Sequence, residues 1–410
     1  MNRFFSLVVC CLVSGCIDLE GAWAVCLDGG GACTPLDAGT TMVEEDAGTS
    51  DAGPPPYDGG PVCTGSTHRR LRCDAPINVG TGTNIVSGAM VESSEGLVLG
   101  WAGATVEVRE FMFDGGTRSL ITGESASNAQ LTLDARGSWW AAAWLDRGAT
   151  AMKCTVGTGV PQLVANIDGG VLDTPTLALN STGGVALSAR VDPRMVAGSV
   201  MVGCPASLAP VAVGSTNSVG VTFTSGAGDG FRYVWTDQIN AYNGSLNILA
   251  LSNGTIAGQT STPSSQRAPQ GLGVAASTSG ATVFTAYSAI NTSDQYELGL
   301  WATSADLAGD GILQQVSSVE PGWWTVGRCG PGCMATGVIA YDAPGPAAVH
   351  FFSDDVSATP RGVWDVACGL QPQMNDGSTV SLAPFGSRLA VLLTARTTAR
   401  LYLCDLPPDP

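Results

Sequence analysis

The sequence is poor in the residues on which most catalytic and metal sites depend. Its 410 residues include one lysine, Lys153, and two histidines, His68 and His350. There is no G-x-S-x-G elbow, no phosphate-binding glycine loop and no C-x-x-C pair. A serine hydrolase needs a nucleophile beside a base, and a structural zinc site needs closely spaced cysteines or histidines. We therefore predict no catalytic residues, no metal and no cofactor, and the sequence leans away from an enzyme.

Helical patterning and long apolar runs are also missing. No segment places apolar residues at helical spacing over three turns, and 54 glycines oppose long helices. The longest apolar run near the N-terminus, 4–13, is shorter than the roughly 20 residues that a membrane-spanning helix needs. These absences predict an all-β protein without a transmembrane helix.

The first residues have the pattern of an export signal. Arg3 supplies a positive charge, an apolar stretch follows, and small residues precede Cys16 in the sequence Val-Ser-Gly-Cys. This end of the chain resembles the signal peptide and lipobox of bacterial lipoproteins. The resemblance implies that residues 1–15 are removed and that Cys16 carries the lipid that binds a membrane. Because Ile17 and not aspartate follows Cys16, we expect the outer membrane of the cell envelope, facing the periplasm or the surface.

An acidic segment, 16–62, comes next. It contains nine carboxylates, no lysine or arginine, repeated Asp-Ala-Gly units and a run of three prolines. Such a composition cannot bury enough apolar surface to offset its ordering entropy, so we predict a disordered tether. The tether resembles those of myxobacterial lipoproteins. It holds about half of the formal charge of −17, and an acidic chain of this kind is not expected to bind nucleic acid.

Ten cysteines remain after the signal peptide and Cys16 are set aside. An even number in an exported chain predicts disulfides, up to five here. Close spacing suggests the pairs Cys26–Cys33, Cys63–Cys73 and Cys329–Cys333, although connectivity cannot be deduced from sequence.

The chain after residue 75 repeats a hairpin of two short strands joined by a glycine-containing turn. The seven copies are Val86–Trp101, Leu131–Trp144, Leu177–Val191, Val219–Trp235, Leu272–Tyr287, Val338–Phe352 and Val380–Leu393. A third strand follows most copies and a weaker fourth follows several. Four short strands per unit, at a spacing of roughly 43–64 residues, are typical of a β-propeller blade.

Residues 63–410 are therefore predicted to form a seven-bladed β-propeller, with 75–79 supplying the outer strand of the last blade. Six or eight blades, or a β-sandwich pair, are the alternatives. The region resembles β-propellers in general and no single repeat family, so the resemblance implies a fold and no functional residues.

One segment, 304–335, departs from the repeat and is interpreted as an insertion. It contains Trp323, Trp324 and Arg328 before the Cys329–Cys333 pair. Two adjacent tryptophans in a strand cannot both point into one core, so one of them could be exposed on a binding surface. We predict a binding scaffold for a protein or glycan partner. An exported polysaccharide-acting enzyme with carboxylates in the central funnel, or a subunit of an envelope assembly, are the alternatives.

Overall fold

The computed structural model describes residues 63, 66–126, 131–145, 152–164, 175–191, 194–200, 202–210, 218–225, 230–240, 243–252, 255–261, 274–279, 282–290, 296–304, 306, 311–317, 321–340, 345–370 and 378–407. The chain divides into two units after Pro55, and all of these residues belong to the unit Pro56–Pro410. The predicted signal peptide, Cys16, the tether and the Cys26–Cys33 pair lie outside the described residues.

Strands are the only regular elements in this part of the chain, and they form six four-stranded sheets and one five-stranded sheet. The four-stranded sheets, in chain order, are β3 (Ser87–Glu92), β4 (Gly96–Ala102), β5 (Thr105–Met112) and β6 (Thr117–Ser125); β7 (Thr132–Arg136), β8 (Trp139–Leu145), β9 (Met152–Val156) and β10 (Gln162–Val164); β11 (Thr176–Leu179), β12 (Val185–Val191), β13 (Arg194–Ser199) and β14 (Ala209–Pro210); β15 (Ser218–Ser225), β16 (Phe231–Asn240), β17 (Asn243–Ser252) and β18 (Thr255–Ser261); β19 (Val274–Ser279), β20 (Thr282–Ile290), β21 (Tyr296–Ser304) and β22 (Ile312–Ser317); and β27 (Thr379–Phe385), β28 (Arg388–Ala395), β29 (Thr398–Asp405) and β2 (Ile77–Thr81). The five-stranded sheet contains β23 (Pro321–Gly330), β24 (Cys333–Ala340), β25 (Gly345–Ser353), β26 (Pro360–Leu370) and β1 (Arg69–Arg70).

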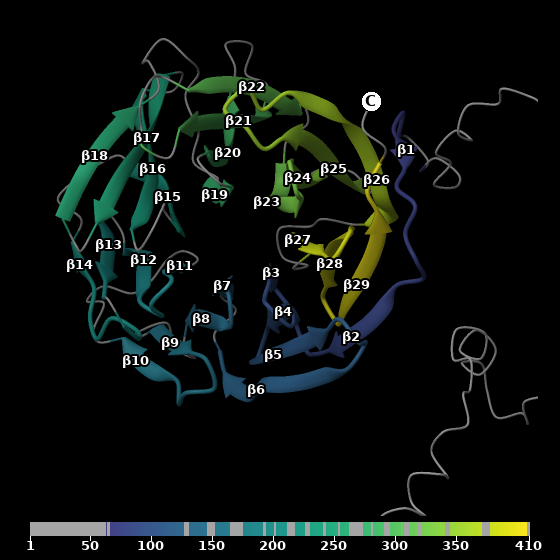
Figure 1. Ribbon diagram of the computed structural model, residues 1–410, viewed down its shortest axis with the longest axis horizontal. Helices are drawn as coiled ribbons and strands as arrows, with labels where there is room; N and C mark the ends of the chain where they lie inside the picture. The colour runs from purple at the N-terminus through teal and green to yellow at the C-terminus, as the bar shows by residue number, and fades with distance from the viewer. Residues whose placement is uncertain are drawn as a thin grey trace, which may run out of the picture. The chain divides into compact units, whose positions relative to one another are not determined.

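The sheets surround a central axis as the blades of a propeller do (Figure 1). Their innermost strands contact one another in the order β3, β7, β11, β15, β19, β23 and β27, and β27 contacts β3 again. The prediction of an all-β propeller is confirmed. Each predicted hairpin contributes strands to a different sheet, although one sheet carries a fifth strand that the repeat pattern did not predict.

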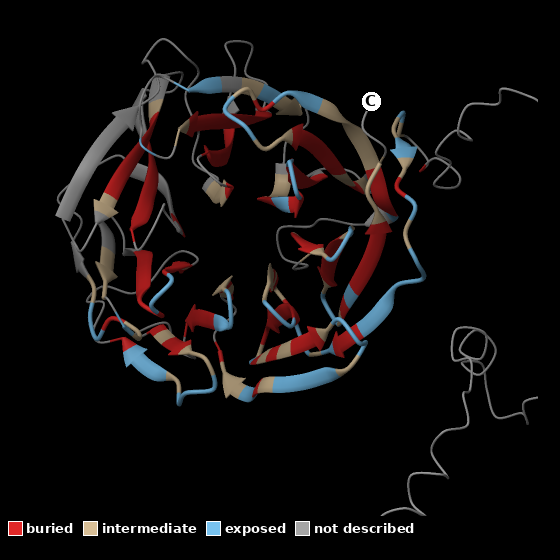
Figure 2. Ribbon diagram, in the orientation of Figure 1, coloured by how far each residue is buried: buried red, intermediate tan, exposed pale blue. Residues whose placement is uncertain are grey.

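The hydrophobic core lies between neighbouring sheets. β4 is buried along its whole length, and β8 is buried after its first residue. A sheet that is covered on both faces needs apolar side chains on both faces of its inner strands, which explains these continuous apolar runs. Figure 2 shows much of the burial in the second strands of the sheets, such as β4 and β8, whereas outer strands such as β6 and β10 are largely exposed. Trp101, Trp144 and Trp301 are fully buried in these intersheet cores.

Segments from the start of the described chain complete two sheets built from its end. β2 pairs antiparallel with β29 and forms the outer strand of the sheet that holds the C-terminal strands. This is the place that the sequence analysis assigned to residues 75–79. β1 pairs parallel with β26, which places Arg69 opposite Trp364. The ring is therefore held closed by N-terminal strands.

Two disulfides fix these N-terminal strands covalently. Cys73 is bonded to Cys404 and Cys63 to Cys368, at sequence separations of 331 and 305 residues. The predicted Cys63–Cys73 pair is wrong, because these cysteines flank β1 and each lies against a strand that arrives from the far end of the chain.

Two more disulfides join residues that are closer in sequence. One links Cys154 to Cys204 across neighbouring sheets, and the other links Cys329 to Cys333, as close spacing had suggested. Disulfides persist in oxidising compartments and are rare in the cytosol, so the four bonds indicate an exported protein.

No helix in the described ranges is long and apolar enough to cross a membrane.

In the sixth repeat, the predicted hairpin is displaced by one strand towards the outer edge of its sheet. Residues 338–352 were predicted as the first and second strands of this unit, but they span β24 and β25, the second and third. The first strand is β23, inside the segment that was interpreted as an insertion. Cys329-Gly-Pro-Gly-Cys333 is the turn between β23 and β24, so it corresponds to the glycine-containing turns of the other units.

Candidate functional site

The two tryptophans of the predicted binding surface are part of the core packing. Both lie in β23, and neither is exposed. Trp323 packs against the cluster shared with the β27–β29 sheet, and its Nε1 donates to the Val380 carbonyl at 3.1 Å. Trp324 points to the opposite side and packs against the cluster shared with the β19–β22 sheet. The alternation of the strand places each ring, partly buried, against a different neighbouring core. Their assignment to a binding surface stays a prediction.

Arg328 is the exposed member of the predicted trio. Its Nη1 lies 3.7 Å from a carboxylate oxygen of Glu92, which ends the inner strand β3. Partial burial raises the pKa of Glu92, and the guanidinium of Arg328 opposes this shift. The pair is half-exposed and spans two sheets, and exposed ion pairs of this kind contribute little to stability.

Large exposed apolar side chains gather instead at one junction between sheets. The described residues expose eight of them: Ile77, Phe113, Trp139, Val160, Leu163, Val202, Ile312 and Val356. Three of the eight come from the segments around this junction: Trp139 begins β8, Val160 lies in the β9–β10 turn, and Val202 precedes Cys204 by two residues. Single exposed apolar residues are ordinary on a protein surface, whereas a group of them indicates an interaction site.

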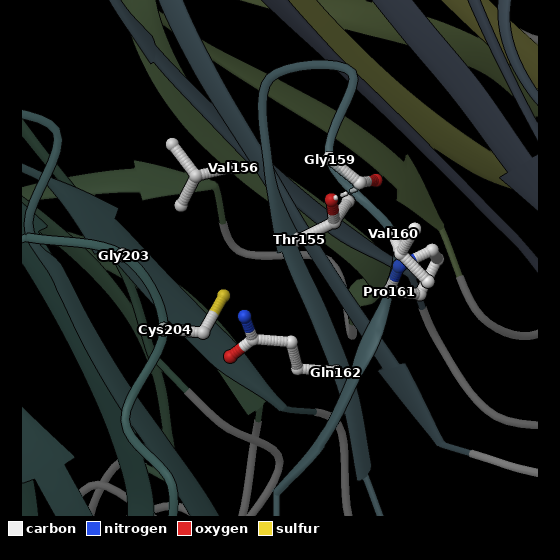
Figure 3. Close-up of a pocket in the computed structure, with 8 residues that line it drawn as sticks. All are labelled: Thr155, Val156, Gly159, Val160, Pro161, Gln162, Gly203 and Cys204. Atoms are coloured by element: carbon white, nitrogen blue, oxygen red, sulfur yellow. Dashed lines mark hydrogen bonds between the residues drawn. The ribbon is translucent and has the colours of Figure 1, made fainter.

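A shallow pocket of about 290 Å³ lies within this group, and we call it the junction pocket. It is lined by Thr155, Val156, Gly159, Val160, Pro161, Gln162, Gly203 and Cys204 (Figure 3). One wall is the end of β9, the following turn and the start of β10; the other is the segment between β13 and β14. The Cys154–Cys204 bond joins these two walls, so the width of the pocket is set covalently.

Few polar groups enter the junction pocket. The Thr155 hydroxyl donates to the Gly159 carbonyl at 2.9 Å and holds the turn. The Gln162 side chain is exposed, and Figure 3 shows its amide extending towards the Cys204 side chain of the other wall. No charged side chain lines the pocket. The site can therefore offer one amide, backbone polar groups and apolar contacts, which suits binding and supplies no group for acid–base chemistry.

Trp139 lies beside the junction pocket with 47% of its surface exposed. In strand β8 it shares a face with Ala141 and Ala143, which belong to the apolar cluster behind the pocket. The neighbouring Trp140 faces the opposite core and is buried. Trp139 was not among the predicted site residues, although the adjacent tryptophans at 139 and 140 form the same sequence pattern as those at 323 and 324.

Both histidines of the chain meet on the five-stranded sheet. The ring centroids of His68 and His350 are 6.4 Å apart, and the Nδ1 of His68 lies 3.3 Å from a carboxylate oxygen of the fully buried Asp365. Burial lowers the pKa of His350 to about 4, with a smaller contribution from the nearby His68. His350 is therefore neutral near pH 7.

Asp134 has the opposite shift. Burial raises its pKa to about 6, although the backbone N–H groups of Leu179 and Ala135 donate to its carboxylate and favour the charged form. The hydrogen bond from Leu179, at 2.7 Å, joins the inner strand β7 to the inner strand β11.

These two groups should have opposing effects on the pH dependence of stability. Between about pH 6.5 and 4 the unfolded chain protonates His350 before the folded protein does, so the free energy of unfolding falls as the pH falls. Between about pH 6 and 4 the folded protein protonates Asp134 first, so the same free energy rises. Urea denaturation at pH 7 and pH 4.5 should show the two contributions largely cancelling.

The variant His350→Gln should remove only the first contribution. When the pH is lowered from 7 to 4.5, the free energy of unfolding changes in both proteins. This change should be about 2 kcal/mol more positive in the variant than in the parent protein. An unchanged difference between the two pH values would contradict the assignment.

Three carboxylates that could serve a polysaccharide-acting enzyme have structural partners. Glu110 is buried and accepts a 2.5 Å hydrogen bond from Arg118, and Asp354 accepts one from Ser279 at 3.1 Å. Glu107 accepts a hydrogen bond from the Gly123 N–H. Within the described ranges, no group of three or more histidine, cysteine or acidic residues could hold a metal ion.

Comparisons with known proteins give only distant similarities. No protein-family model matches the chain, and no curated protein sequence does. A protein of unknown function from Dyadobacter fermentans has a similar structure, with a TM-score of 0.47, 8% identity, and coverage of 81% of this chain and 99% of that one. An ulvan lyase has the same TM-score at 10% identity, covering 81% and 96%. The Aleuria aurantia lectin bound to α-methyl-L-fucoside reaches 0.39 at 11% identity, covering 77% and 90%. Similarity this low carries no information on ligand or reaction.

Proposed function

We propose that this chain is a lipid-anchored binding scaffold of the cell envelope that holds a partner at the junction pocket. Cys16 attaches it to a membrane, which we take to be the outer membrane, and the acidic segment 16–62 is a flexible spacer. The propeller is the rigid part that presents the binding surface to a protein or glycan.

The observation that carries this proposal is the group of exposed apolar side chains around the junction pocket. Trp139, Val160 and Val202 project from two sheets that Cys154–Cys204 locks together. Binding to a preorganised surface loses less conformational entropy than binding to a mobile one, so a covalently fixed apolar pocket favours recognition. The lining offers no titratable group for catalysis.

The alternative of a polysaccharide-acting enzyme requires two carboxylates about 5–10 Å apart near the central axis. Among the described carboxylates, Glu92 and Glu110 are each paired with an arginine, so each already has a structural partner. We therefore place binding ahead of catalysis, with an envelope assembly subunit as a special case of binding.

Photocrosslinking in living cells tests the proposed site. With p-benzoyl-phenylalanine in place of Val160, ultraviolet light should give a product of higher mass that contains the partner. The matched control places the same group at Val356, which is also exposed but lies in the turn between β25 and β26. Adding Trp139→Ala to the Val160 variant should weaken the product. The same product from both positions, or none from either, would contradict the proposal.

A further inference from the structure

Resting on the proposed function, we infer that the ligand at the junction pocket is a neutral glycan, with one sugar ring stacked on Trp139. The inference joins three features of the molecule: the way in which Trp139 is supported, its place beside the pocket, and the chemistry of the lining.

Gly183 supports one face of the Trp139 ring. A Cβ atom built on Gly183 would lie 3.4 Å from both Cδ2 and Cε3 of the indole and 3.6 Å from Cε2. Cδ2 belongs to both rings and is bonded to the other two atoms, so an approach centred on it is an approach to the face of the ring. Because 47% of Trp139 is exposed, we take the opposite face to be the one that a ligand can reach. Gly183 has a φ of +79°, which disfavours any residue with a side chain at this position.

Trp139 lies next to both walls of the junction pocket. The carbonyl of its neighbour Trp140 accepts a hydrogen bond of 2.8 Å from Gly157, in the turn that contains Gly159. On the other wall, the Gly183 carbonyl accepts a hydrogen bond of 2.9 Å from Gly203, which lines the pocket. Trp139 is not itself a lining residue, but it lies next to both walls, so a ligand of two or more units could contact the indole and the pocket together.

The chemistry of the lining fits an uncharged sugar. One face of a pyranose carries several C–H groups, which pack on an aromatic face, while its hydroxyls need donors and acceptors. The Gln162 amide provides both, and backbone groups of the turn add more. A volume of about 290 Å³ is just below the range for ligand pockets, ~300–1,000 Å³, and is suited to a single ring.

Charge favours a neutral ligand over an acidic one. No arginine, lysine or histidine lines the junction pocket. The chain's only lysine, Lys153, bonds to Glu124 at 2.7 Å on the neighbouring outer strand. Binding a carboxylated or sulfated sugar generally needs charge-assisted hydrogen bonds, which this lining does not supply.

The test is titration calorimetry and saturation-transfer NMR with the full chain purified in detergent. The probes are maltohexaose, cellohexaose, laminarihexaose and chitohexaose, with polygalacturonate as an acidic comparison. At least one neutral oligosaccharide should bind, and Trp139→Ala should weaken that binding tenfold or more. Trp139→Phe keeps an aromatic face and should retain most of it. Phe113→Ala, which removes a ring of similar exposure on a different sheet, should leave it unchanged.

Three results would overturn the inference: no neutral oligosaccharide binds, Trp139→Ala binds as well as the parent, or Phe113→Ala loses binding equally. Thermal denaturation of each variant shows whether it is folded. The photocrosslink at position 160 separates the two proposals. If a protein is crosslinked while every oligosaccharide fails to bind, the binding scaffold stands and the glycan assignment falls. If neither is seen, both fall.

Discussion

Removing the Cys73–Cys404 and Cys63–Cys368 disulfides together should destabilise the propeller by more than the sum of the two single removals. Each bond alone closes a loop of more than 300 residues. While one bond remains, however, the other constrains only about 46 further residues of the unfolded chain, ten between Cys63 and Cys73 and 36 between Cys368 and Cys404. The cost of a missing crosslink rises with the logarithm of the loop that it closes.

The chain-entropy relation gives about 4 kcal/mol for either single removal and about 10 kcal/mol for both. In a double-mutant cycle, removing both bonds should therefore destabilise the protein by about 2 kcal/mol more than the sum of the two single removals. Because whole domains are stable by only about 5–15 kcal/mol, the protein that lacks both bonds should be close to unfolding under native conditions.

Urea denaturation of the paired Cys→Ser variants measures these free energies. The control is removal of Cys329–Cys333, whose separation of four residues should make its loss cost about 2 kcal/mol. If the two long-range bonds prove additive, or if the control costs as much as either of them, closure of the ring by these crosslinks is not what stabilises the protein.

Changing Cys16 to alanine should move most of the protein from the membrane fraction to the soluble fraction. The prediction follows from the lipobox-like sequence before Cys16 and from the shortness of the apolar run, which cannot span a bilayer. A single acyl chain binds membranes only weakly, so firm attachment needs the several chains that a lipidated N-terminal cysteine carries. Fractionation and immunoblotting of cells give the distribution directly.

The matched control for this experiment is Cys26→Ala, which removes a cysteine of the same segment outside the lipobox and should leave the protein in the membrane fraction. Metabolic labelling with a fatty acid should mark the parent protein and the control, and not the Cys16 variant. A Cys16 variant that stays with the membrane, or a mature protein that retains Met1, would contradict the lipid anchor.

The repeat pattern was sufficient to predict the fold because a propeller's inner strands have to be apolar on both faces. β4, β8 and β28 all show this run, and a glycine-containing turn precedes each one. The prediction failed in the sixth unit, where the first strand begins with Pro321-Gly322 and its turn is enclosed by a disulfide. Both features suggested a loop, although a Gly-Pro-Gly turn can join two strands as well as any other.

The candidate site could be predicted only in part. A pair of adjacent tryptophans in a strand indicates that the rings face opposite sides, and the same reasoning applies to Trp139 and Trp323. Whether both sides are covered depends on the neighbouring sheets, which sequence spacing does not specify. Trp323 and Trp324 lie in β23 between two neighbouring sheets, whereas Trp139 is the exposed first residue of β8. The long-range disulfide pairs could not be predicted for the same reason, because sequence spacing does not specify which strands become neighbours.

The Cys63–Cys368 bond determines how the domain responds to mechanical load. If the preceding segment is anchored, any pull on a bound partner is transmitted through residue 63. From there part of the force passes by a covalent bond to β26, so β1 and β2 carry less tension than they would without the disulfide. A reducing agent would redirect that tension to the outer strands, which would then peel from the ring one hydrogen bond at a time. Single-molecule pulling from residue 56 should therefore show an unfolding force that drops sharply when the disulfides are reduced.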